Sequence, residues 1–143
     1  MFSKACEHGI RAVLFLATQS EVHQTVKIPA ISEAIKSPKA YTSKILTKLV
    51  QHNIVHSQTG PKGGFYIDSN QLAQISIKDI VLAIDGSAMF SQCGLGLESC
   101  DAKNPCPMHD TFSALRTQLK QNLECTSLLD IVQNKNKHAL NLK

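Results

Sequence analysis

The sequence predicts a mainly α-helical fold with one β-hairpin, in the order of a winged helix-turn-helix, followed by a long C-terminal helix. Apolar residues recur at helical spacing in three successive segments of the N-terminal half. The spacing then changes to that of two short strands around a glycine-rich turn. Beyond a cysteine-rich segment, helical spacing resumes at Phe112, Leu115, Leu119 and Leu123, which predicts the long helix.

Size and composition suit one small domain. The chain has 143 residues, of which 43% are hydrophobic, enough for a buried core. Its longest purely apolar run, residues 12–17, is far too short to cross a bilayer. We therefore expect a cytoplasmic protein without membrane contact, in which five cysteines do not form a disulfide framework.

Start signals mark the first three predicted helices. Ser3 is a suitable N-cap for the first helix. The second helix is short and begins near Pro29, because proline is favoured in the first turn. Ser37 is the expected cap of the third helix, with Pro38 at its first position.

The third helix is predicted to be amphipathic. Its apolar stripe consists of Tyr41, Ile45, Leu46, Leu49 and Val50. Its expected outer face is cationic and rich in hydroxyl groups, and consists of Lys39, Thr42, Ser43, Lys44, Thr47 and Lys48.

A hairpin and further helices follow. Residues 54–57 and 65–67 are predicted strands, joined by a turn with three glycines, a proline and Lys62. Ser76 and Asp79 have the spacing of a capping box at the start of a fourth helix. Thr126 or Ser127 is the expected cap of a short final helix.

The excess positive charge lies in one segment. Residues 34–67 contain no Asp or Glu, and their five lysines supply +5, whereas the rest of the chain has 10 basic and 11 acidic residues. A charge run by itself is often only a solvated surface. Combined with the helix-turn-helix order, it favours double-stranded DNA as the partner, with the third helix in the major groove.

Ten residues are candidates for DNA contact. They are Ser37, Lys39, Tyr41, Thr42, Ser43, Lys44, Lys48, Thr59, Lys62 and Gly63. The four lysines would neutralise phosphates, and Thr42 and Ser43 would read base edges. Core packing is the alternative role for Tyr41, which lies on the apolar stripe.

Three cysteines and a histidine form a second motif. Cys93, Cys100, Cys106 and His109 follow the pattern Cys-x6-Cys-x5-Cys-x2-His. Three thiolates and an imidazole can ligate an iron–sulfur cluster or a zinc ion. Zinc ligand pairs are usually about two to four residues apart. The wider gaps here therefore favour a cluster.

The fourth ligand has alternatives. A histidine at a helix start, as His109 is, can simply be exposed. Cys6, Glu7 and His8 are near enough to the N-terminus to reach a cluster from another subunit. Cys6 and Cys125 are isolated along the chain, and we expect both to pack as small apolar groups.

Residues 1–133 resemble the IscR/NsrR-type family of winged-helix iron–sulfur transcription regulators. The resemblance rests on residues 37–46, wing residues 60–65 and the three loop cysteines. It implies a homodimer formed through the long helix, and a cluster whose presence, loss or redox state alters DNA affinity. A 2Fe–2S cluster is favoured, with 4Fe–4S as the alternative.

The resemblance also assigns ligands by position. Cys93, Cys100 and Cys106 match the three cysteine ligands, and His109 matches the IscR-type histidine. In NsrR-like members an acidic residue on the partner subunit's first helix can ligate instead, and Glu7 lies near that position. Thr59 departs from the family, which often has arginine before the wing glycine, and His8 replaces a common tyrosine.

This interpretation divides the chain into four parts. Residues 1–86 form the winged helix-turn-helix DNA-binding domain and residues 87–109 the cysteine-rich cluster-binding loop. Residues 110–133 hold the dimerisation helix and the short final helix, and residues 134–143 a disordered tail.

The predicted function is that of a transcription regulator, for example a repressor, whose promoter affinity depends on a cluster that senses iron, nitric oxide or redox state. The alternative is a winged-helix regulator with a zinc site or no metal, which responds to another ligand or protein partner. A redox carrier is disfavoured because it needs no acid-free basic segment. No residues suggest hydrolytic or transfer chemistry, so we do not expect an enzyme.

Overall fold

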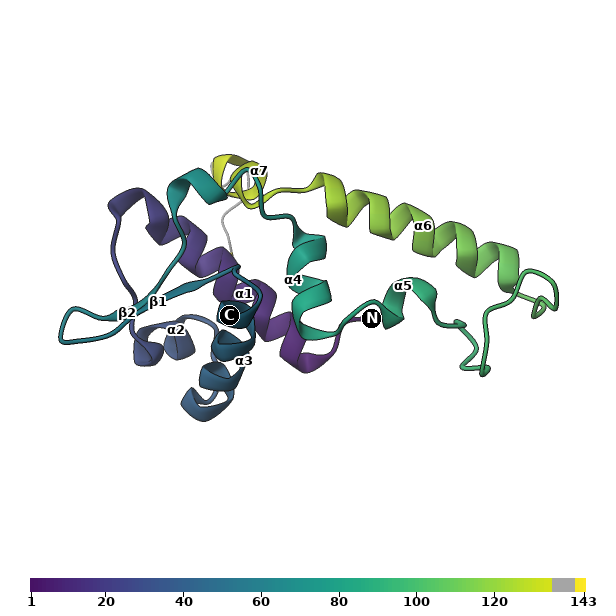
Figure 1. The fold of residues 1–143 in the computed structure, drawn as a ribbon, viewed down its shortest axis with the longest axis horizontal. Helices are drawn as coiled ribbons and strands as arrows, with labels where there is room; N and C mark the ends of the chain where they lie inside the picture. The colour runs from purple at the N-terminus through teal and green to yellow at the C-terminus, as the bar shows by residue number, and fades with distance from the viewer. Residues whose placement is uncertain (135–140) are drawn as a thin grey trace.

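A computed structural model, which describes residues 1–134 and 141–143, has a helical body with a β-hairpin wing and a long helix leading away from it (Figure 1). This arrangement confirms the predicted fold class. The elements in chain order are α1 (Lys4–Gln19), the 3-10 helix η1 (Ser20–Val22), α2 (Ile28–Ala34), α3 (Lys39–Gln51), β1 (His56–Gln58), β2 (Gly64–Tyr66), the 3-10 helix η2 (Ser69–Gln71), α4 (Ile77–Ile84), α5 (Ala88–Ser91), α6 (His109–Cys125) and α7 (Leu128–Gln133).

Helix α1 is the centre of the core. It packs against α2, α3, α4 and α7, and its inward face is fully buried. Gly9 lies where α1 meets α3 and α4, and a Cβ atom there would overlap the side chain of Ile84 and lie 3.3 Å from Cγ2 of Ile45. The missing side chain therefore sets how closely these three helices approach each other.

Capping groups fix the starts of α1, α4 and α7. The Ser3 side chain accepts a hydrogen bond from the Cys6 backbone N–H at 3.0 Å, as predicted. Ser3 is itself held by Asp85, whose carboxylate accepts both its backbone N–H, at 3.0 Å, and its hydroxyl. The predicted Ser76–Asp79 capping box is present, and Ser127 caps α7 in the same way.

The wing is fastened to the loop before α2. Strands β1 and β2 are antiparallel, with His56 opposite Tyr66. Val26 and Phe65 exchange two backbone hydrogen bonds of 2.8 Å, and the Thr25 hydroxyl donates to the Lys62 carbonyl at 2.8 Å. These hydrogen bonds tie the hairpin to the segment that leads into the helix-turn-helix.

Four sequence-based boundaries are wrong. Helix α3 begins at Lys39, with Pro38 as its N-cap residue, because the Ser37 side chain is buried instead of facing the helix end. The two strands are shorter and shifted relative to residues 54–57 and 65–67. Ile54 and Val55 enter the core before β1 begins. The predicted loop after α4 contains a short helix, α5.

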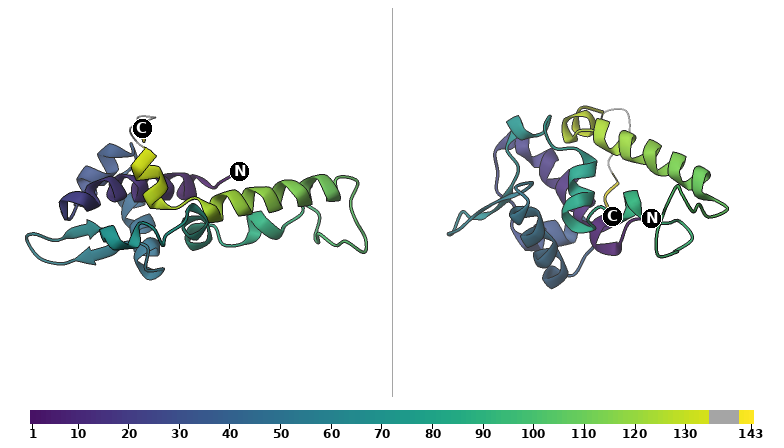
Figure 2. Two further views of the ribbon diagram at one scale, coloured as in Figure 1. Left: turned by 90° about the horizontal axis from the view of Figure 1, so that it is seen from above. Right: turned by 45° about the vertical axis from the view of Figure 1, so that its right-hand side comes forward.

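Helix α6 extends away from the body, and the cysteine loop lies at its N-terminal end (Figures 1 and 2). None of its 17 residues, all of which the structure describes, is buried. Helix α7 returns to the body, where Leu128 and Val132 join the core. Within the described part of the chain, no helix is both long and apolar enough to span a membrane. Most of the predicted tail, residues 135–140, lies outside the described residues.

Replacing Ser76 with Ala removes the side-chain acceptor at the start of α4. We expect the free energy of unfolding to fall by about 1 kcal/mol, the usual cost of losing an N-cap. Urea denaturation followed by circular dichroism measures this change. Ser76→Asn is the matched control, because asparagine caps about as well as serine. An equal loss in both variants would contradict the role of the cap.

Candidate functional site

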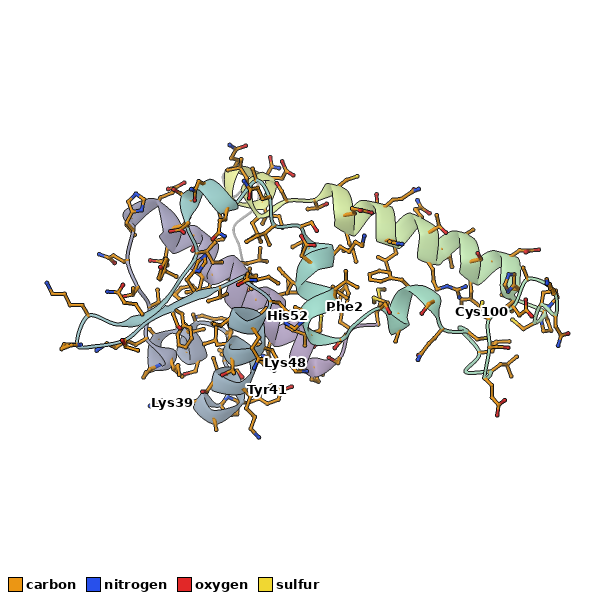
Figure 3. All side chains as sticks on the ribbon, in the orientation of Figure 1. Phe2, Lys39, Tyr41, Lys48, His52 and Cys100 are labelled. Carbon is orange, nitrogen blue, oxygen red and sulfur yellow. The ribbon has the colours of Figure 1, made fainter. Side chains whose placement is uncertain are left out.

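The outer face of α3 carries exposed cations. Lys39, Lys44 and Lys48 are exposed, and Figure 3 shows Lys39, Tyr41 and Lys48 along this helix. The Lys48 ammonium donates to the Ile84 carbonyl at the end of α4, at 3.4 Å. Lys39 and Lys44 lie nearer the N-terminus of α3, the end that enters the major groove in helix-turn-helix proteins.

Two candidate DNA contacts on and before α3 have buried side chains. The Thr42 side chain is fully buried and Ser37 is 9% exposed. Both hydroxyls lack a hydrogen-bond partner among the described residues. The helical positions of Tyr41, Ile45 and Leu46 surround Thr42 with the apolar stripe, so its side chain faces the core and cannot reach a base edge. Ser43, which is half-buried, retains access.

The wing keeps two of its three candidates. Thr59 and Lys62 are exposed. Gly63 is buried, and its backbone N–H donates to the Gly60 carbonyl at 2.9 Å. That N–H is therefore not available to a phosphate, which counts against the predicted DNA contact at Gly63. A Cβ atom at Gly63 would overlap the Gln58 carbonyl, so this glycine serves the turn.

Tyr41 connects α3 with the start of α1. Its ring lies edge-on to His8, with centroids 5.5 Å apart and planes at 87°. The Nδ1 atom of His8 is 2.9 Å from Nη2 of Arg11. Burial, followed by the charge of Arg11, lowers the pKa of His8. Tyr41 is half-buried, so both of its predicted roles remain compatible with its position.

The cysteine motif is brought together in two pairs. The Sγ atoms of Cys93 and Cys106 are 4.0 Å apart. The Cys100 Sγ atom lies 3.5 Å from Nδ1 of His109. Hydrogen bonds from the backbone of Leu95 and Leu97 lower the pKa of Cys93. Figure 3 shows Cys100 at the end of the molecule opposite to the wing, remote from α3.

Within each pair, the two donor atoms are as far apart as two ligands of one tetrahedral metal ion. Bonds of about 2.3 Å place two thiolates about 3.8 Å apart, and a thiolate and an imidazole about 3.6 Å apart. The observed 4.0 Å and 3.5 Å agree with these values. Among the described residues, no three histidine, cysteine or acidic side chains converge on one metal ion. The four donors are thus arranged as two separate pairs, each with the spacing of two ligands to one metal ion.

Sequence reasoning missed Arg116. Its guanidinium donates to the Cys100 Sγ atom at 3.0 Å and to the Gln92 carbonyl at 3.1 Å. Arg116 follows His109 by seven residues and so lies on the same face of α6. That spacing is the sequence signal that identifies it.

The N-terminal candidates do not meet the loop cysteines within one chain. Glu7 pairs with Lys4 at 2.8 Å, and this hydrogen bond lowers its pKa. Cys6 is buried as predicted, and burial followed by Asp85 raises its pKa to about 12. Such a thiol is a poor metal ligand. Cys125 is exposed, so its predicted packing is wrong.

Comparison with known proteins decides the family. The Rrf2 family model, described as an iron-dependent transcriptional regulator, matches residues 2–134. The chain belongs to the Rrf2 family. Over 128 residues it is 32% identical to a protein of Neisseria meningitidis serogroup A named as an HTH-type transcriptional regulator, with 90% of this chain and 84% of the relative covered. It is 28% identical over 129 residues to IscR of Sodalis glossinidius, with 89% and 75% covered.

Solved structures share the Rrf2 fold. The structure of CymR from B. subtilis superimposes with a TM-score of 0.78 at 19% identity, covering 93% of this chain and 96% of the other. IscR of T. potens superimposes with a TM-score of 0.75 at 16% identity, covering 98% and 91%. As an Rrf2 protein, the chain is a DNA-binding transcriptional regulator, and the prediction that it is not an enzyme is confirmed.

Replacing Thr42 with Val tests the correction at that position. A buried hydroxyl without a partner costs about 1–3 kcal/mol, and valine fills nearly the same volume. We expect the free energy of unfolding to stay level or to rise by about 1 kcal/mol, with DNA affinity unchanged. Urea denaturation and fluorescence anisotropy with labelled duplex measure the two quantities. Weaker DNA binding by a stable Thr42→Val variant would restore Thr42 as a contact.

Replacing Lys44 with Ala tests the basic face. Each phosphate contact contributes about one unit to the slope of log affinity against log salt concentration. We expect Lys44→Ala to reduce that slope by about one, measured on duplex DNA of mixed sequence. Lys120→Ala removes the same charge from α6 and is the matched control. Equal slopes for the two variants would remove Lys44 from the interface.

Proposed function

We propose that this Rrf2 protein is a homodimeric regulator whose DNA affinity is controlled by an iron–sulfur cluster, with 2Fe–2S as the cluster type. The observation that carries the proposal is the division of the motif into two ligand pairs. Each iron of a two-iron cluster takes two protein ligands. Cys93 with Cys106 would hold one iron, and Cys100 with His109 the other.

The cluster would supply redox and ligand chemistry that the side chains lack. When bound, it would give the site redox chemistry and reactivity toward nitric oxide. The chain's own residues position it: Gly94 packs on the Phe112 ring, since a Cβ atom at residue 94 would lie 2.6–2.8 Å from ring atoms. This contact holds the loop close to α6. Glu7 of a partner subunit is the alternative to His109.

The exposed face of α6 supports a dimer. Leu115 is 56% exposed. Together with Leu119 and Met1, it lines a cavity of about 500 Å3 beside the loop. Apolar side chains left in water on the open side of a helix favour covering by another surface. The same face of a second copy would cover it.

A continuous set of contacts leads from the loop to α3. Helix α6 packs on α4, where Lys78 and Glu124 form an ion pair of 3.1 Å. The last turn of α4 offers its Ile84 carbonyl to Lys48 of α3. A shift of α6 on loading of the loop would therefore reach the DNA-binding helix through α4. Linkage between the two sites requires that α3 be placed differently in the loaded and the metal-free protein.

The second candidate is a regulator of the same fold with zinc or no metal. It is supported by the likeness to CymR, which is described as the global cysteine regulator of B. subtilis. Paired thiols 4.0 Å apart would also suit a response to thiol chemistry.

Anaerobic reconstitution with iron and sulfide separates the candidates. We expect about two irons and two sulfides per chain, with visible absorption, for a 2Fe–2S cluster. Cys106→Ala should lose the cluster because one iron keeps a single protein ligand, whereas Cys125→Ala is the matched control and should load fully. Stoichiometric zinc without sulfide would favour the second candidate.

The fourth ligand is resolved by the same measurement. We expect His109→Ala to lose the cluster or shift its absorption bands, and Glu7→Ala to leave both unchanged. The reverse result would assign the fourth position to the partner subunit's first helix.

Salt-matched DNA binding by loaded and metal-free protein measures the coupling between the cluster and DNA, which we expect to change DNA affinity by about 5- to 150-fold.

A further inference from the structure

We propose that Arg116 is a positioning residue for the cluster, which fixes Cys100 relative to the start of the loop and makes the bound cluster easier to reduce. This inference rests on the proposed cluster and assigns part of its control to a residue outside the ligand set. Arg116 would not touch iron. It acts through the sulfur of Cys100 and through the backbone beside Cys93.

The contacts of Arg116 span the loop. One guanidinium nitrogen, Nη2, donates to the Cys100 Sγ atom at 3.0 Å, and the other, Nη1, donates to the Gln92 carbonyl at 3.1 Å. Gln92 directly precedes Cys93, which belongs to the other ligand pair. One planar side chain therefore sets the spacing between the two pairs. A rigid fork with two donors suits this task better than a flexible ammonium.

Helix α6 presents Arg116 together with two other residues that contact the loop. His109, Phe112 and Arg116 lie at i, i+3 and i+7, which is one face of an α-helix. His109 contacts Cys100, and Phe112 packs under Gly94. Arg116 is half-buried between these contacts and the helix. The position of its charge is therefore determined by packing.

Electrostatics gives the direction of the effect. Three thiolates make the ligand set negative, and each electron added to the cluster makes it more so. A guanidinium in contact with a ligand sulfur stabilises the more negative, reduced form. Hydrogen bonds to ligand sulfurs act in the same direction. Removing Arg116 should therefore make reduction harder.

The experiment compares Arg116→Gln, Arg116→Lys and Lys120→Gln after anaerobic reconstitution. Redox titration followed by visible absorption gives the midpoint potential of each. For Arg116→Gln we expect at least a tenfold fall in the equilibrium constant of one-electron reduction, which is about 59 mV. Arg116→Lys keeps the charge, so its midpoint potential should shift by less than half as much as that of Arg116→Gln. Lys120→Gln removes a charge one turn further along α6, and its midpoint potential should match that of the wild type.

The rate of cluster loss to an iron chelator is the second readout. We expect loss to be severalfold faster for Arg116→Gln than for Lys120→Gln, because the two ends of the loop are no longer joined. Far-UV circular dichroism and the urea midpoint of the metal-free protein check that each variant is folded. Unchanged potential and loss rate in a loaded Arg116→Gln variant would overturn this inference alone. Wild-type protein that takes up no iron and sulfide would overturn the proposed function, and this inference with it.

Discussion

The close approach of α3 and α4 to α1 over Gly9 is the constraint on which the rest of the structure depends. Ile45 and Ile84 occupy the space that a side chain at residue 9 would need. This contact determines where the outer face of α3 points, and it places the end of α4 next to Ser3, whose bond to Asp85 holds the start of α1. The outer face of α3 and the end of α4, on which α6 packs, are thus placed by one set of packed helices.

Features that depend on local chemistry were predictable from the sequence. The caps at Ser3 and Ser76 involve partners three residues away, so spacing alone reveals them. The burial of Thr42 and Gly63 was not predicted, because it depends on the packing of the core and on the hairpin geometry. A period of 3.6 residues places Thr42 near the border of the apolar stripe, and only tertiary contacts decide on which side such a residue falls.

The candidate metal centre shows the same division. Residue types and spacing predicted the donor set, but not its separation into Cys93 with Cys106 and Cys100 with His109. That separation, like the bond from Arg116, arises because the loop folds back onto α6. Loop conformation is not encoded by periodicity, so neither feature follows from a pattern of residues. The wide gaps between the cysteines allow the loop to arrange its four donors as two separate pairs.

The open side of α6 has a consequence for how the regulator would behave at different abundances. Helix α6 packs on α4 and α5 along one side only, and none of its residues is buried, so a second copy covering the open side would add to its stability. By mass action, the melting temperature of the protein would then rise with its concentration. Sensitivity to the signal would be set in part by how much of the regulator the cell makes.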